Sequence, residues 1–273
     1  MSFNASSQGK TTSAVLARSV VIWFVLALLG QWLFAYFILG FYGSSVLAGN
    51  FQAWSKNTML FKGYVADDPI GNWIFALHVM LAAIVAFGGV VQFLPQIRAR
   101  AMWLHQWNGR VFASSAIAAS IGGLYLVWVR GSSANPIAAL AISLNAVLIL
   151  VFCVLAWRAA RAGNIARHRV WALRSYIAAN GVWFQRAGYF AWFLINQAPV
   201  GITKKLDGPF DLFWAFGCYL LPLSVLELYL YAKATAGTLG KLAMAVALAL
   251  VSLLTTAGIL GIYLFVWRKL LLL

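Results

Sequence analysis

The chain has 273 residues, of which 63% are hydrophobic and only 9% are charged. Soluble domains are roughly half apolar and about a quarter charged, so this composition excludes a soluble globular protein. The formal net charge of +15 could indicate binding to nucleic acid, but the basic residues flank apolar runs, which favours a membrane protein with no nucleic-acid partner.

Seven apolar runs are each long enough to cross a hydrocarbon core of about 30 Å, which takes about 20 helical residues. Backbone groups cannot stay unpaired in lipid, so each run is predicted to be a helix. We therefore predict an all-α, polytopic bundle of about seven transmembrane helices. The runs are residues 19–42, 71–95, 109–129, 136–157, 170–195, 209–231 and 239–267.

The segments outside these runs are short. Residues 1–18 are expected to form a cytoplasmic tail whose Ser/Thr/Gln-rich first part, residues 1–13, is disordered, and residues 19–273 to form one transmembrane domain. The longest connection, 43–70, carries spaced aromatic residues, which predicts a short helix at the membrane interface. The connection at 131–135 is tight, so its flanking helices are predicted to form an antiparallel hairpin.

Basic residues are concentrated in alternate connections between the runs. They gather around 96–104 and 158–169, whereas the intervening connections carry most of the acidic residues. This alternation predicts that the N-terminus and both basic connections face the cytoplasm. We expect an integral protein of the bacterial inner membrane that contacts anionic lipids at its cytoplasmic face.

Ionisable residues are costly in a bilayer and mark candidate functional positions. A rise of 1.5 Å per helical residue converts position into depth and divides these residues into two layers roughly 15 Å apart. The outer layer is predicted to hold His78 and Arg186, with Asn145 and Tyr189 nearby. The inner layer is predicted to hold His105, His168, Arg110, Arg174, Glu227 and Gln92.

Most of these residues also have a purely structural interpretation. His78 can form a hydrogen bond to a neighbouring helix. Arg110 and Arg174 can reach lipid phosphates, and Glu227 can pair with one of them. Arg186 is harder to explain because no acid lies at its predicted level. We therefore expect a bound anionic group, a water-filled cavity, or both, within reach of Arg186 and His78.

Several separated motifs resemble the domain-of-unknown-function 2306 family, a group of predicted bacterial multi-pass membrane proteins. The motifs are His78, GVVQF at 89–93 with Arg98, HQWNGR at 105–110, HRVW at 168–171 with Arg174-Ser175-Tyr176, and Arg186. The resemblance implies a membrane-embedded core over about 71–197 and a role for the three histidines and Arg186. Gln106 and Ala172 stand where family members often have Arg and Met, and the second departure argues against a thioether ligand at that point.

The leading functional hypothesis is a redox protein that binds haem b and passes electrons within the bilayer, with quinone as a candidate partner. Haem iron takes axial histidines, and His105 with His168 is the predicted pair. Arg110 and Arg174 would then contact the propionates, and His78 with Arg186 would form a second cofactor site.

Two alternatives remain open from the sequence. In a metal-dependent membrane hydrolase, His78, His105 and His168 would hold zinc and activate water, although no histidine pair at helical spacing supports it. In a non-catalytic transporter or assembly subunit, the polar layers would only join helices. The residues that would carry catalysis, and the oligomeric state, are left open.

Overall fold

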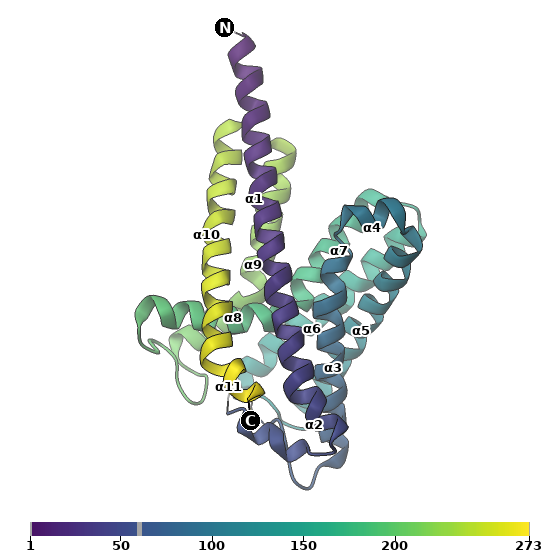
Figure 1. The fold of residues 1–273 in the computed structure, drawn as a ribbon, viewed down its shortest axis with the longest axis vertical. Coiled ribbons are helices and arrows are strands. Elements are labelled where there is room, and N and C mark those ends of the chain that lie inside the picture. The colour runs from purple at the N-terminus through teal and green to yellow at the C-terminus, as the bar shows by residue number, and fades with distance from the viewer. Residues whose placement is uncertain (1, 59–61, 273) are drawn as a thin grey trace.

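The computed structural model describes residues 2–58 and 62–272, and these residues contain helices but no strand. Six helical segments among them are long and apolar enough to cross a membrane, which confirms the predicted all-α polytopic bundle (Figure 1). The elements are α1 (Ser2–Phe37), η1 (Ile38–Gly43), α2 (Ser44–Leu47), η2 (Phe51–Lys56), α3 (Pro69–Val91), α4 (Pro95–Arg100), α5 (Met102–Trp128), α6 (Pro136–Arg161), α7 (Ile165–Ala179), α8 (Gly181–Asn196), α9 (Pro209–Thr235), α10 (Thr238–Ile262), η3 (Tyr263–Trp267) and α11 (Arg268–Leu271).

The N-terminal helix α1 is longer than predicted. It begins at Ser2, so the expectation of a disordered segment over residues 1–13 is wrong from Ser2 onward. That segment contains one glycine, Gly9, and no proline, so little in it opposes extension of a helix that the apolar run has nucleated. In Figure 1 this end of α1 extends beyond the other helices.

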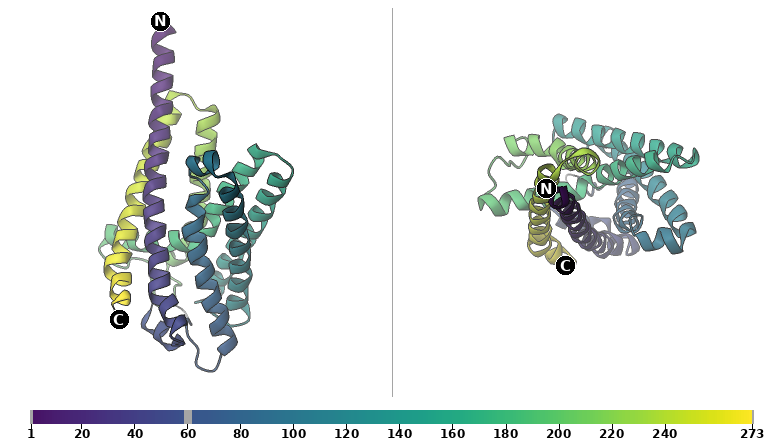
Figure 2. Two further views of the ribbon diagram at one scale, coloured as in Figure 1. Left: turned by 45° about the vertical axis from the view of Figure 1, so that its right-hand side comes forward. Right: turned by 90° about the horizontal axis from the view of Figure 1, so that it is seen from above.

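The connections gather at two ends of the bundle (Figures 1 and 2). The N-terminus of α1, α4 and the α6–α7 connection lie at one end, which we call the basic end because of the arginines around it. The connections at 48–68, 129–135 and 197–208 lie towards the other, distal end, together with the C-terminus. The tight 129–135 connection joins α5 and α6 as the predicted antiparallel hairpin.

The fifth apolar run, predicted as one helix over 170–195, is divided into α7 and α8 at Asn180. The Asn180 Nδ2 donates to the carbonyl of Tyr176 at 2.8 Å, and the Asn180 backbone N–H donates to the same carbonyl at 3.2 Å, so Asn180 caps the end of α7 through both groups. Gly181 follows at once and disfavours continuation of the helix. As a result α8 runs across α1 and α10 instead of alongside them (Figures 1 and 2).

Glycines allow α8 to cross its neighbours closely. Gly258 of α10 meets the backbone of Ala187, where a Cβ atom has no room. A Cβ atom on Gly30 of α1 would lie 2.8 Å from the ring of Trp183, which is fully buried. Small residues permit such backbone approach between membrane helices, so these two crossings fix α8 against α1 and α10.

Two π-helical turns, η1 and η3, lie near the distal end, and Trp267 of η3 packs on the last turns of α1, which lead into η1. The Trp267 ring stacks on Phe34 and Phe37 with centroid distances of 5.2 and 5.1 Å. A π turn holds more residues than an α turn, so it changes which side chains face the interior. The turn in η1 places Tyr42 inside the bundle, with 3% of its surface exposed.

The distal connections are held by two buried ionic anchors. Arg130 donates through Nε to Asp68 at 2.9 Å, and only 3% of its side chain is exposed. Asp211 is 1% exposed and accepts from the Tyr189 hydroxyl at 2.9 Å. It also accepts from the backbone N–H groups of residues 203 and 208. These bonds order the segments on the distal side of the candidate site.

The short helix predicted within 43–70 is present as the 3₁₀ helix η2. Its Trp54 is fully buried rather than lying at the lipid interface, because the ring packs on Tyr42, Phe75 and Phe51. The connection at 43–70 therefore packs against the distal end of the bundle.

Candidate functional site

His105 and His168 meet at the basic end. They lie in the first turns of α5 and α7, and their imidazoles are close enough to interact electrostatically. The His168 Nδ1 lies 3.0 Å from the carbonyl oxygen of Ala156. Because a carbonyl only accepts, Nδ1 carries the hydrogen and Nε2 keeps its lone pair. The His105 Nδ1 is buried without a hydrogen-bond partner among the described residues.

The two arginines predicted beside these histidines have different surroundings. Arg174 forms a bidentate pair with Glu227, at 2.7 Å from Nε and 2.9 Å from Nη2, and its guanidinium also lies over the ring of Trp171. Arg110 is exposed and lies over the ring of Trp107, 4.9 Å from the centroid. Both segments contain His, Trp and Arg in this order, and each forms a similar stack of Arg on Trp. The stack in α7 also contacts a carboxylate.

Other motif residues join α3, α5 and α7. The Gln92 Nε2 donates to the backbone carbonyl of His105 at 3.1 Å. The Asn108 Nδ2 donates to the carbonyl of Gly88 at 2.8 Å. A Cβ atom on Gly89 would lie within 3.1 Å of both Phe112 and Tyr176, so the glycine lets two rings pack against α3. These contacts hold His105 and α7 in a fixed relation at the basic end.

His78 lies between α3 and α5 in the distal half, apart from the other two histidines. Its Nδ1 is 2.9 Å from the carbonyl oxygen of Ala119, so Nδ1 carries the hydrogen here as well. The ring also packs near Gly123, where a Cβ atom would lie 3.2 Å from Cε1. The interhelical hydrogen bond expected from the sequence is thus present, and it leaves Nε2 for another partner.

Arg186 is partly exposed and has few partners. Its Nη1 donates to the carbonyl of Val182, one turn earlier, at 2.9 Å. Its guanidinium lies over the ring of Phe34, 5.3 Å from the centroid. It interacts electrostatically with Tyr42 and with His78. Arg186 therefore lies within electrostatic range of His78 and Tyr42.

The two polar neighbours predicted for Arg186 have other contacts. The Tyr189 hydroxyl donates to Asp211. Asn145 lies against Gly181 at the α7–α8 break, and its Oδ1 is buried without a partner among the described residues. Neither residue supplies a negative charge to Arg186.

Tyr42 and Asn57 lie near His78 and Arg186, and we call these four residues the distal cluster. The membership of Tyr42 and Asn57 was not predicted from the sequence. The Asn57 Nδ2 donates to the Tyr42 hydroxyl at 2.7 Å, and both residues are buried. Tyr42 falls at the end of an apolar run, where a tyrosine is normally an interfacial residue, and no local pattern reveals a π turn. One signal was available, because an Asn-Gly step at 180–181 is a common breaker and predicts the change of direction that sets Arg186 against α1.

The three histidines do not converge on one point. The part of the chain that the structure describes contains no group of three or more His, Cys, Asp or Glu side chains that could hold a metal ion. A zinc site made of His78, His105 and His168 would require such a group. The residues therefore do not fit the predicted three-histidine zinc centre.

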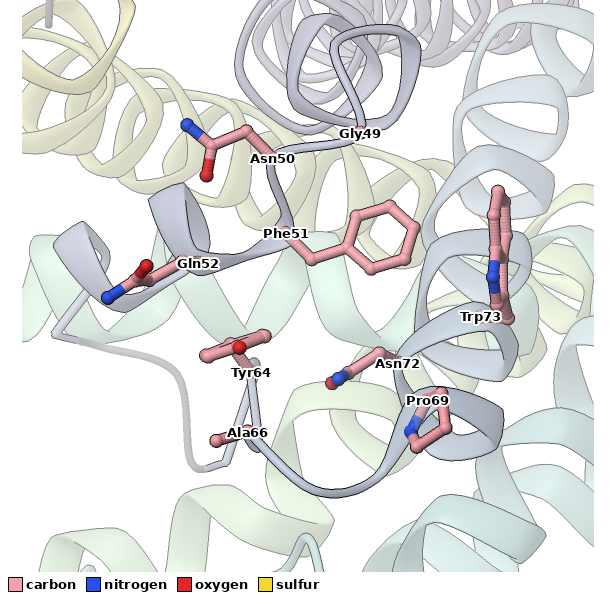
Figure 3. A pocket seen from close by; sticks show the side chains of 9 residues that line it. All are labelled: Gly49, Asn50, Phe51, Gln52, Tyr64, Ala66, Pro69, Asn72 and Trp73. Carbon is pink, nitrogen blue, oxygen red and sulfur yellow. The ribbon is translucent and has the colours of Figure 1, made fainter.

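A pocket of about 330 Å³ opens at the distal surface (Figure 3). The rings of Phe51, Tyr64 and Trp73 surround it, and Asn72 lies at its base. Both amide atoms of Asn72 are already used, by the backbone of Val65 and by Arg130. The pocket is also lined by the polar residues Asn50 and Gln52, so its surface is mixed. Its Phe51 packs on Trp54, which in turn packs on Tyr42.

Residues 75–206 match the model of a family described as predicted membrane protein, DUF2306. This match confirms the resemblance that the separated motifs predicted. No curated protein and no solved structure matches the chain. The DUF2306 segment runs from within α3 to the connection after α8, so it contains the three histidines and Arg186 but not Tyr42.

Proposed function

We propose that the protein is a membrane-embedded redox protein that holds haem b between His105 and His168 and passes electrons within the bilayer, with a quinone as one partner. The observation that supports the proposal most directly is that the two histidines lie in the first turns of α5 and α7, within electrostatic range of each other at one end of the bundle. The carbonyl of Ala156 fixes the ring of His168 in the way that second-shell acceptors orient metal-bound histidines.

The surrounding residues fit a haem group in part. The buried Nδ1 of His105 has no partner among the described residues, so the imidazole has no competing hydrogen bond to give up on binding iron. Arg110 has no carboxylate partner and suits a propionate. Arg174 already pairs with Glu227, so it links α7 to α9 and is not proposed to contact a propionate. Haem would supply the electron-carrying iron, His105 and His168 would hold it, and the surrounding basic residues would also suit anionic lipid.

His78 is not proposed as a haem ligand. No second histidine accompanies it, since the chain has three and the other two lie at the basic end. The expected second cofactor site at His78 and Arg186 therefore lacks an axial pair for haem.

The test is an absorption spectrum and a pyridine haemochrome assay on detergent-purified full-length protein expressed with added haem precursor. We expect a Soret band that is lost in His105→Ala and His168→Ala and retained in the matched control His78→Ala. Reduction of the band by a quinol would support the quinone partner. A wild-type protein without a Soret band, or one in which His78→Ala acts like His168→Ala, would contradict the proposal.

A second candidate, transport of a polar substrate, is favoured by the α7–α8 break. Interrupted helices at membrane depth form the central sites of many transporters, and α8 begins beside the buried amide of Asn145. Absence of haem together with uptake of a polar solute into proteoliposomes would favour this candidate.

A further inference from the structure

We propose that Arg186, Tyr42 and His78 form a binding site for an oxyanion, meaning a carboxylate or phosphate group, in the distal half of the bundle. The site is separate from the proposed haem site at the basic end and does not depend on it.

The first argument is the charge balance around Arg186. A guanidinium remains protonated and has five N–H donors, yet the contacts of Arg186 among the described residues are one carbonyl, that of Val182, and the face of Phe34. An aromatic face attracts a cation but accepts no strong hydrogen bond. An arginine in this position is costly in a bilayer unless an anion or water meets it.

No acidic side chain of the protein can be that anion. The chain has five acidic residues, and all of them lie in the described part. Four have other partners: Asp68 with Arg130, Glu227 with Arg174, Asp211 with Tyr189, and Asp207 with the Thr203 hydroxyl. The fifth, Asp67, is exposed in the distal connection and forms no ion pair within the described residues. An anion that meets Arg186 would therefore come from a ligand and not from a side chain of the protein.

The second argument is the hydrogen-bonding character of the two neighbours. The Tyr42 hydroxyl accepts from Asn57, so its own hydrogen remains to be donated. His78 has used Nδ1 on Ala119, and its Nε2 becomes a donor when an anion favours the protonated ring. Arg186 lies over Phe34. Phe34 and Phe37 both stack on Trp267, and Tyr42 packs on Phe37, so the guanidinium and the tyrosine belong to one cluster of side chains. The cluster combines donors and positive charge without an acid, which suits an oxyanion.

The third argument is position. Tyr42 lies directly beneath the distal connection, because Asn57 belongs to that connection and Trp54 of η2 packs on the tyrosine ring. An oxyanion could reach this level from a phospholipid headgroup or from the aqueous phase. Both sources present the same group to Arg186, so the chemistry is shared and the experiment must separate them.

The test uses full-length protein in neutral detergent at constant ionic strength, with thermal unfolding measured against sodium phosphate and sodium succinate. Binding of phosphatidylglycerol is measured in nanodiscs against phosphatidylcholine by native mass spectrometry. We expect at least one of the three anionic probes to bind. Its affinity should fall by about ten-fold or more in Arg186→Gln, because charge-assisted hydrogen bonds are lost.

Matched variants keep the result interpretable. Arg169→Gln removes an exposed arginine at the basic end and should leave binding unchanged. Arg186→Lys preserves the charge but not the two-pronged geometry, and Tyr42→Phe removes one donor, so both should weaken binding while the protein still folds. Response to phosphate or succinate identifies a soluble source, and response to phosphatidylglycerol alone identifies a lipid.

The proposal is overturned if no probe binds, or if Arg186→Gln, Arg186→Lys and Tyr42→Phe all bind the probes as the wild type does. Haem content is measured in the same preparations. Loss of anion binding in Arg186→Gln with unchanged haem content would separate this site from the proposed redox site. A haem-free wild type that binds the anion would reject the redox proposal alone.

Discussion

Arg174 and Arg186 lie on the two halves of one interrupted helix, and each guanidinium lies over an aromatic ring, at 4.5 Å from Trp171 and 5.3 Å from Phe34. Only Arg174 also meets a carboxylate, through the bidentate pair with Glu227. The two sites therefore differ in what completes them. In α7 the protein supplies the counter-charge, and in α8 a ligand has to supply it.

Exposure does not distinguish the two arginines, since both are partly exposed. Glu227 is 47% exposed on its side chain, so solvent and lipid headgroups already share the charge of the α7 pair, and the pair stabilises the fold only modestly. Arg186 lies over the buried ring of Phe34 and forms no ion pair among the described residues, so its charge is not balanced within the protein. A membrane protein can tolerate such a charge when binding requires it, and this is why Arg186 rather than Arg174 marks a site.

The largest expected effect is a loss of stability when a substitution at the α8–α10 crossing displaces α8. Gly258→Ala places a Cβ atom against the backbone of Ala187 and should destabilise the protein by about 2 kcal/mol or more, as overpacking does. Gly237→Ala is the control, because nothing lies within 4 Å of its added Cβ atom. Unfolding in detergent with increasing denaturant measures both. Equal stability of the two variants would show that the crossing does not fix α8.

A second substitution should give Arg186 a carboxylate partner within the protein, as Arg174 already has. Val182→Glu places a carboxylate one turn before Arg186, in the favourable order for an i, i+4 pair. We expect oxyanion affinity to fall by about ten-fold with little change in stability, since Val182 is 39% exposed. Val182→Gln is the isosteric control without charge. If the two variants bind the probes equally, the charge of Arg186 is not what recruits the anion.

The smallest expected effect is at the α7 pair. Glu227→Gln should cost at most about 1 kcal/mol of unfolding free energy, because the pair is largely exposed. Oxyanion binding at Arg186 should be unchanged. A new anion-binding site at Arg174 in this variant would sharpen the comparison, since it would show that removal of the acid is enough to create one. A loss of several kcal/mol of unfolding free energy would mean that solvent does not screen the Arg174–Glu227 pair, although Glu227 is exposed.

The sequence was sufficient for features that depend on distance along a helix. Counting residues placed Glu227 at the level of Arg174 and His78 at the level of Arg186, and in the structure Arg174 pairs with Glu227 and Arg186 lies within electrostatic range of His78. The break at Asn180 did not follow from such counting, because the apolar run continues past Asn180 with no charged residue before Arg186. Hydropathy reports burial in lipid and not direction, so it cannot distinguish one crossing helix from two angled pieces.

The contacts of the distal cluster depend on connections, and these were the least predictable. Asp211 lies near the start of the predicted run 209–231, and the folded chain buries it among a hydroxyl and two backbone N–H groups. Asn57 reaches Tyr42 across fifteen positions through a 3₁₀ helix. Such pairs depend on backbone dihedrals that apolar periodicity does not encode.

The two π turns also decide how this chain tolerates changes of length. A π turn contains one residue more than an α turn, so deleting one residue from it restores a regular helix and leaves the segments beyond it close to their original direction. The same deletion within a regular α-helix rotates everything beyond it by about 100°. In η1 the deletion would change which side chains of the turn face the interior, Tyr42 among them, and in η3 it would do the same for Trp267. Relatives that differ in length should therefore accept a one-residue gap at either π turn more readily than within the regular helices around it.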